Sequence, residues 1–131
     1  MGSQSIVIHI QIIDHLDRDS TLSYECSALY QEQPNSLSYL EKDESTQVEL
    51  ILNDTEWILH RASQWQTHIT FRFDGTGTFR VISDQGEMHG QVKILKHQLD
   101  THKISITYKL IMDDSVITHQ TLTYTMKGAQ A

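Results

Sequence analysis

The residues that could bind a metal or perform acid–base chemistry are abundant in this chain, but they form no recognised pattern. Eight histidines, one cysteine and seventeen acidic residues are present. A zinc site needs three or four converging ligands, and the histidines contain neither a pair two residues apart within one extended segment nor a helical H-x-x-x-H. His60 and His68 lie in consecutive predicted strands, so they can be neighbours. We nevertheless predict no metal site and no cofactor.

Nucleophilic catalysis finds no support either. Cys26 lies in mid-strand between Tyr24 and Ala28, without the nearby base or helix N-terminus that activates a thiol. The chain has no G-x-S-x-G elbow, no phosphate-binding glycine loop and no dinucleotide fingerprint. Gly75 and Gly77 join two strands, which favours a hairpin. We therefore predict no catalytic residue, and an enzyme ranks last among the functions considered.

Arg61 is the single residue whose position is most informative. If Trp57 and Leu59 point inward, the two-residue period of a strand directs Arg61 inward as well. A buried guanidinium must be paired. Arg61 then either meets an internal carboxylate or carbonyl, or holds the acidic head of a ligand. The alternative is a position at the exposed rim.

The elements that must position these side chains are β-strands. Apolar and polar residues alternate with a period of two, and short polar turns interrupt the alternation about every ten residues. Residues 36–45 are also compatible with a short helix. The predicted strands span residues 5–14, 21–30, 37–42, 46–53, 56–62, 65–73, 78–83, 87–99, 103–112 and 115–126.

This pattern predicts an all-β fold, an antiparallel up-and-down closed barrel of about 8–10 strands. An open meander of that length would expose two edges, and closure removes them. The 131 residues, of which 38% are hydrophobic, suit one domain over residues 1–131, with an ordered barrel over about residues 5–127. One proline and six glycines exclude collagen-like and low-complexity chains.

The charge is unevenly distributed. Residues 14–56 contain eleven acids and two bases, a net −9, whereas residues 57–131 contain six acids and eight bases, a net +2, which together give −7. This acidity argues against nucleic-acid and membrane partners. The acidic half is either a solvated surface or a face for a basic partner. We expect a cytoplasmic protein, because the N-terminus lacks a secretory pattern, no apolar run approaches membrane-spanning length, and the one cysteine has no partner.

Several short motifs resemble a known family. One predicted strand ends in an arginine before a small residue, and an aromatic strand leads into Asp74-Gly75. A glycine turn then precedes a long strand, and the last two predicted strands form a β-hairpin. The segments concerned are residues 57–63, 69–75, 85–88, 104–108 and 122–124. In these the chain resembles the YwiB-like family of small bacterial proteins of unknown function. The resemblance implies a calycin-like (lipocalin-like) barrel and brings no activity with it.

The barrel suggests a function through its width. Eight strands leave an interior just wide enough for side chains or one small ligand, and the diameter grows with strand number. We therefore hypothesise a non-catalytic barrel that binds a small, partly apolar or acidic molecule in its lumen. The alternative is an interaction module or homodimer that uses the acidic N-terminal half or a sheet face. The candidate ligand-binding residues are Arg61, Trp57, Tyr24, Tyr108 and Phe71.

Overall fold

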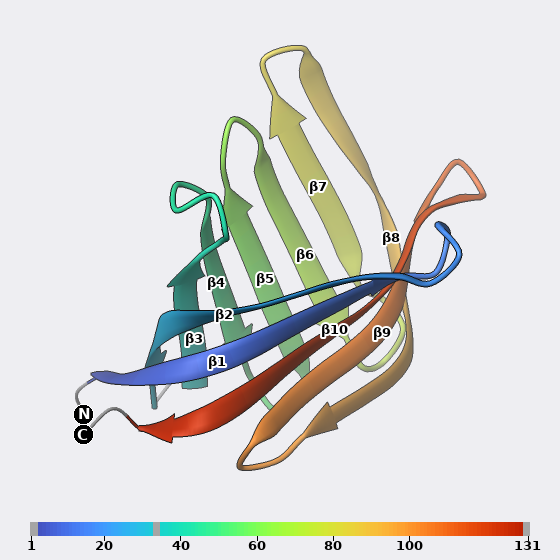
Figure 1. The fold of residues 1–131 in the computed structure, drawn as a ribbon. Helices are drawn as coiled ribbons and strands as arrows, with labels where there is room; N and C mark the ends of the chain where they lie inside the picture. Colours follow the sequence, from blue (N-terminus) through green and yellow to red (C-terminus); the bar gives the residue numbers. More distant parts are fainter. Residues whose placement is uncertain (1–2, 33–34, 130–131) are drawn as a thin grey trace.

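The chain forms a closed antiparallel β-barrel of ten strands, in which sequential strands are neighbours and β1 closes on β10 (Figure 1). A computed structural model describes residues 3–32 and 35–129. The strands are β1 (Ser3–Asp14), β2 (Ser20–Gln31), β3 (Asn35–Leu40), β4 (Gln47–Leu52), β5 (Glu56–Ala62), β6 (Gln66–Arg72), β7 (Thr78–Ser83), β8 (Gly86–Leu99), β9 (Lys103–Met112) and β10 (Ser115–Ala129).

The predicted fold class is confirmed, and each predicted strand has its counterpart. The helical alternative for residues 36–45 is wrong, because β3 occupies its first half and a turn occupies the rest. That turn is stabilised by the side chain of Asp43, which accepts hydrogen bonds from Ser45 and Thr46. Within the described ranges the structure has no helix that is long and apolar enough to cross a membrane.

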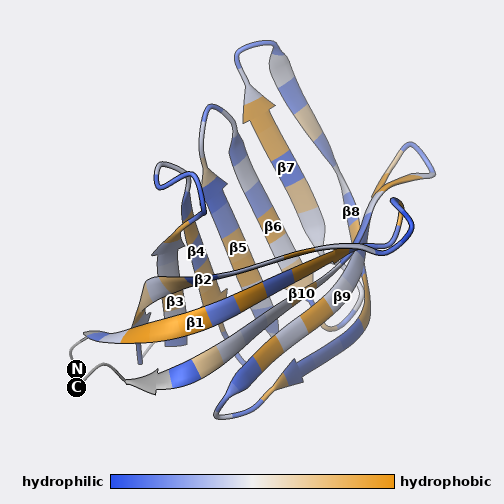
Figure 2. Cartoon of the chain, in the orientation of Figure 1, coloured by the Kyte–Doolittle hydropathy of each residue, from blue (hydrophilic) through white to orange (hydrophobic). Residues whose placement is uncertain are grey.

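The two-residue period separates core from surface along each strand. In β1, Ile6, Ile8 and Ile10 are buried. The residues between them, such as His9, point outward. Figure 2 shows this alternation as bands of opposite hydropathy along the strands. Burial of the branched and aromatic side chains on the inner face is the main stabilising contribution to such a barrel.

The barrel is flattened into two layers whose strands run in different directions (Figure 1). The long strand β8 connects them: residues 86–91 pair with β7, whereas residues 91–99 pair with β9. A register shift between Ile94 and Lys96 accompanies this change. Such a bulge bends a strand and increases its twist. On the opposite side the two layers are joined by a short stretch of pairing, because β2 pairs with β3 only over residues 28–31.

The two ends of the barrel differ in what fills them. The end near the termini is packed with rings: Phe73 stacks on His97 at a centroid distance of 4.2 Å, and Trp57 meets both rings edge-on at 5.6 and 5.7 Å. Phe71 contacts Tyr108 edge-on, with 4.9 Å between ring centroids. The other end carries the hairpin turns after β1, β3, β5, β7 and β9, and its interior is not filled.

Candidate functional site

A cavity of about 660 Å³ occupies the barrel interior at this second end. It opens toward solvent where Leu22, Trp65 and Met88 are exposed. Its wall is formed mainly by aliphatic and aromatic side chains, with a few polar groups near the opening. The lining residues are Ile12, Asp14, Ser20, Thr21, Leu22, Tyr24, Tyr39, Glu41, Val48, Leu59, Arg61, Trp65, Thr67, Ile69, Val81, Met88, Tyr108, Leu110, Thr118, Gln120, Leu122 and Tyr124.

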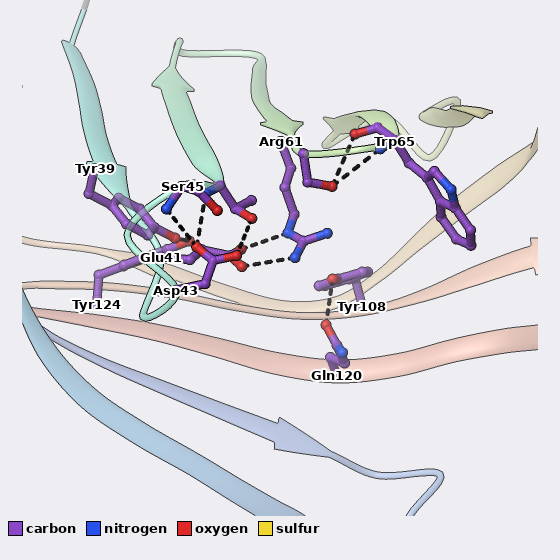
Figure 3. A network of polar contacts seen from close by, with 11 residues as sticks. Tyr39, Glu41, Asp43, Ser45, Arg61, Trp65, Tyr108, Gln120 and Tyr124 are labelled. Atoms are coloured by element: carbon purple, nitrogen blue, oxygen red, sulfur yellow. Dashed lines mark hydrogen bonds and ion pairs between the residues drawn. The ribbon is translucent and has the colours of Figure 1, made fainter. Parts of the chain in front are cut away.

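An ion pair between Arg61 and Glu41 is the most polar feature of the cavity wall (Figure 3). Arg61 Nε donates to Glu41 Oε2 at 2.6 Å, and the Nη2 group donates to Oε1 at 2.8 Å. These hydrogen bonds raise the pKa of Arg61 above its usual value. Such two-pronged pairs are stronger and more directional than a single contact. The pair therefore fixes one edge of the guanidinium, and its other donors have no partner among the residues that the structure describes.

The turn between β3 and β4 holds Glu41 in place. Asp43 accepts hydrogen bonds from the backbone N–H groups of Ser45 and Thr46 and from the Thr46 hydroxyl, at 2.6–2.9 Å. These bonds lower the pKa of Asp43 to about 2. The Glu41 N–H also donates to the Thr46 carbonyl at 2.8 Å. These hydrogen bonds hold the turn in one conformation, in which the carboxylate of Glu41 is directed toward β5.

Four tyrosines from β2, β3, β9 and β10 surround the cavity. The hydroxyls of Tyr39 and Tyr124 share a hydrogen bond of 2.8 Å, and Tyr108 donates to Gln120 Oε1 at the same distance. Burial raises the pKa of these three hydroxyls well above the usual value for tyrosine. They remain neutral at physiological pH, and each of them takes part in a hydrogen bond within the protein.

Tyr24 differs from the other three. Within the described ranges its hydroxyl has no hydrogen-bond partner, while its ring is half-buried against the core. Partial burial, followed by the nearby Glu41 carboxylate, raises the pKa of Tyr24 to about 12. A neutral hydroxyl with both its donor and acceptor unused therefore faces the same cavity as the ion pair.

The structure brings together three of the five candidate residues from the sequence. Arg61, Tyr24 and Tyr108 line the cavity, whereas Trp57 and Phe71 pack in the closed end and do not line it. Sequence reasoning missed Glu41, although the alternation of Leu37 and Tyr39 along β3 places it on the inner face. It also missed further wall residues, for which the sequence offers only the same alternation: Tyr39, Trp65, Gln120 and Tyr124.

Two of the histidines lie on the outer face of the barrel, whereas His97 and Cys26 pack against its core. His60 and His68 are indeed neighbours: they are directly opposite across β5 and β6, and their rings stack with 4.2 Å between centroids. Burial, followed by His60 and Arg80, lowers the pKa of His68. Among the described residues no group of three or more histidine, cysteine or acidic side chains could hold a metal ion. Cys26 is half-buried, and its pKa is raised by burial.

A second hollow, of about 570 Å³, lies on the outer face of β2–β5. Leu29 and Leu40 border it and are exposed. Its rim includes Glu49 and His60. Most of its wall comes from residues that point outward from these strands, whereas Tyr39 and Val48 line both this hollow and the lumen cavity.

Comparisons with known proteins agree with the barrel. A family model described as "Domain of unknown function (DUF1934)" matches residues 6–124. The chain is similar to the crystal structure of the ywiB protein from Bacillus subtilis, with a TM-score of 0.70 and 16% sequence identity over 96% of this chain and 94% of that one. At this identity the likeness concerns the fold. No curated protein matches the chain.

Proposed function

The chain belongs to the DUF1934 family of domains of unknown function, and we propose from its cavity that it is a non-catalytic barrel protein that binds one small, partly apolar molecule in its lumen. The observation that carries this proposal is the cavity of about 660 Å³ inside the closed barrel. Sites for small molecules generally measure 300–1,000 Å³ and combine an apolar wall with a few placed polar groups. This cavity has both properties.

In this proposal the wall residues have distinct roles. Leu59, Ile69 and Tyr108 provide apolar surface for the body of the ligand. The ion pair of Arg61 with Glu41 and the hydroxyl of Tyr24 provide hydrogen bonds for its polar end. Trp57 and Phe71 fill the closed end and do not contact the ligand, because they do not line the cavity.

A thermal-shift screen of small apolar molecules, followed by native mass spectrometry of the hits, tests the proposal. The variant Val81→Trp places a bulky ring in the cavity and is expected to abolish binding. Ile82→Trp is the matched control, because Ile82 follows Val81 on the same strand and points to the outer surface. The proposal fails if no compound raises the melting temperature, or if both variants bind a hit as tightly as the unaltered protein.

The outer hollow supports a second candidate, self-association through this sheet face. Leu29 and Leu40, which border it, are 52% and 43% exposed, and exposed apolar groups of this kind mark interfaces when they form a contiguous patch. Sedimentation velocity at micromolar concentration should then show a dimer that Leu29→Lys dissociates. A monomer at every concentration would exclude this candidate.

A further inference from the structure

We infer that the lumen accepts a molecule with a neutral or positively charged head and discriminates against carboxylates. This inference rests on the proposed function and narrows the class of ligand. It departs from the simple expectation that an arginine inside a barrel holds an acid. Three features of the cavity wall lead to it: the count of charges, the engagement of Arg61 and the acceptors that remain free.

The charges on the wall are predominantly negative. Two of the lining residues are acidic, Asp14 and Glu41, and one is basic, Arg61, so the wall carries a net charge of −1. Among the described residues no lysine or histidine lines the cavity. Asp43, next to the opening, adds a further negative charge close enough to act on Arg61. A second anion that enters this space meets net repulsion, which water screens poorly inside a barrel.

The guanidinium of Arg61 is already neutralised. Two of its five N–H donors are bonded to the oxygens of Glu41 at 2.6 and 2.8 Å. A carboxylate ligand could form the same two-pronged pair only by displacing Glu41. The displaced carboxylate would lose its partner beside a mostly apolar wall, where the side chains of Glu41 and Arg61 are 24% and 42% exposed, and this disfavours the exchange. The remaining donors of Arg61 suit a neutral acceptor such as a hydroxyl or a carbonyl oxygen.

Free acceptors and aromatic faces favour a cation instead. Each oxygen of Glu41 accepts one hydrogen bond from Arg61, and a carboxylate has about four acceptor sites, so about half of its capacity remains for an ammonium group. The hydroxyl of Tyr24 is a further acceptor, because it has no hydrogen-bond partner in the described part of the chain. Trp65 and Tyr39 also line the cavity. Their ring faces attract cations.

Three probes with the same apolar chain separate the alternatives: octylamine, octanol and octanoate, titrated into the full-length protein by calorimetry at pH 7. The amine is protonated at this pH, as a lysine side chain would be. We expect octylamine to bind roughly tenfold or more tightly than octanoate, with octanol between them. Equal or tighter binding of octanoate overturns the inference and leaves the proposed function standing. If none of the three binds, the proposed function itself fails.

Two variants test whether Glu41 is the cause. Glu41→Gln removes the competing carboxylate and frees Arg61, so octanoate should gain roughly tenfold or more in affinity while octylamine loses affinity. Glu56→Gln is the matched control: Glu56 pairs with Arg72 at 3.2 Å, has the same side-chain exposure of 24%, and does not line the cavity. Arg61→Met removes the positive charge from the wall, so octanoate should bind this variant more weakly than it binds the unaltered protein. Affinities of octanoate and octylamine that are unchanged in Glu41→Gln contradict the inference.

Discussion

Two kinds of polar group lie beside each other in the lumen: an ion pair whose members are hydrogen-bonded to one another, and a tyrosine hydroxyl that is not hydrogen-bonded to any described residue. Arg61 and Glu41 satisfy one another through two hydrogen bonds, whereas the hydroxyl of Tyr24 has no partner in the described part of the chain. A polar group that has no partner of its own is available to a ligand. Tyr24 therefore marks the polar end of the proposed site more directly than Arg61 does.

The hydrogen bond between Tyr39 and Tyr124 is expected to stabilise the fold. Removing the hydroxyl in Tyr124→Phe leaves the Tyr39 hydroxyl without its partner, so we expect the free energy of unfolding to fall by about 1 kcal/mol. In the double variant Tyr39→Phe, Tyr124→Phe neither hydroxyl remains, and the loss should be no greater than for the single change. Urea unfolding of the unaltered protein, Tyr39→Phe, Tyr124→Phe and the double variant measures this coupling, and strictly additive losses would contradict it.

The raised pKa of Tyr24 predicts that the free energy of unfolding falls at alkaline pH. Its pKa is about 12 in the folded protein, above the value of about 10 for an unfolded chain. The stabilisation from a neutral Tyr24 is therefore fully present below pH 10 and is lost as the pH rises through the folded pKa. Tyr39, Tyr108 and Tyr124 contribute with the same sign, because burial raises their pKa as well.

Unfolding in urea at a series of pH values above neutrality provides the measurement. The free energy of unfolding should decline above about pH 10, and the decline should be shallower in Tyr24→Phe. A phenylalanine variant with the same pH dependence as the unaltered protein would show that Tyr24 titrates normally.

At the scale of strands, the contact between β7 and β8 depends on a residue without a side chain. Gly90 lies opposite Phe79. A Cβ atom at this position would be 2.2 Å from the Ile111 carbonyl oxygen and 2.7 Å from the Phe79 ring. The backbone of β9 cannot move away without breaking its pairing with β8. Glycine is therefore required here for close packing of three strands rather than for a special backbone angle.

Gly90→Ala should accordingly destabilise the barrel by roughly 1–3 kcal/mol, the usual cost of overpacking a core. Gln91→Ala is the control, since Gln91 is the next residue and its side chain is exposed. Thermal unfolding of both variants measures the difference, and the melting temperature of Gly90→Ala should be the lower one. A melting temperature for Gly90→Ala equal to that of Gln91→Ala would mean that β7 and β9 adjust at no cost.

Much of this strand arrangement is predictable because the alternation is strong and the turns are short. The gap between the predicted strands 103–112 and 115–126 coincides with a turn in the structure: Asp113 and Asp114 adopt positive φ angles of 51° and 64° between the paired residues Met112 and Ser115. The bulge at Ile94–Lys96 was not predicted, because one extra residue in a strand of 14 hardly disturbs the apolar pattern. The same bulge lets β8 pass from one layer to the other.

For the whole molecule, the sequence predicts a closed barrel but not how full it is. The width follows from ten strands, yet Trp57, Phe71 and Phe79 gather at one end, and the other end keeps a cavity. Which end a side chain occupies depends on strand stagger, which alternation alone does not specify. For this reason two of the five candidate residues pack in the closed end, and Glu41, the partner of Arg61, emerges only in three dimensions.

The central claim is that the lumen, and not the outer face, binds a small molecule. A heteronuclear NMR titration of the full chain with octanol tests it most directly, because a neutral probe is independent of the charge preference. We predict saturable shifts for Tyr24, Arg61 and Thr67, which line the cavity. Saturable shifts confined to Leu29, Leu40 and Glu49, which border the outer hollow, or no saturable shift at all, would contradict the claim.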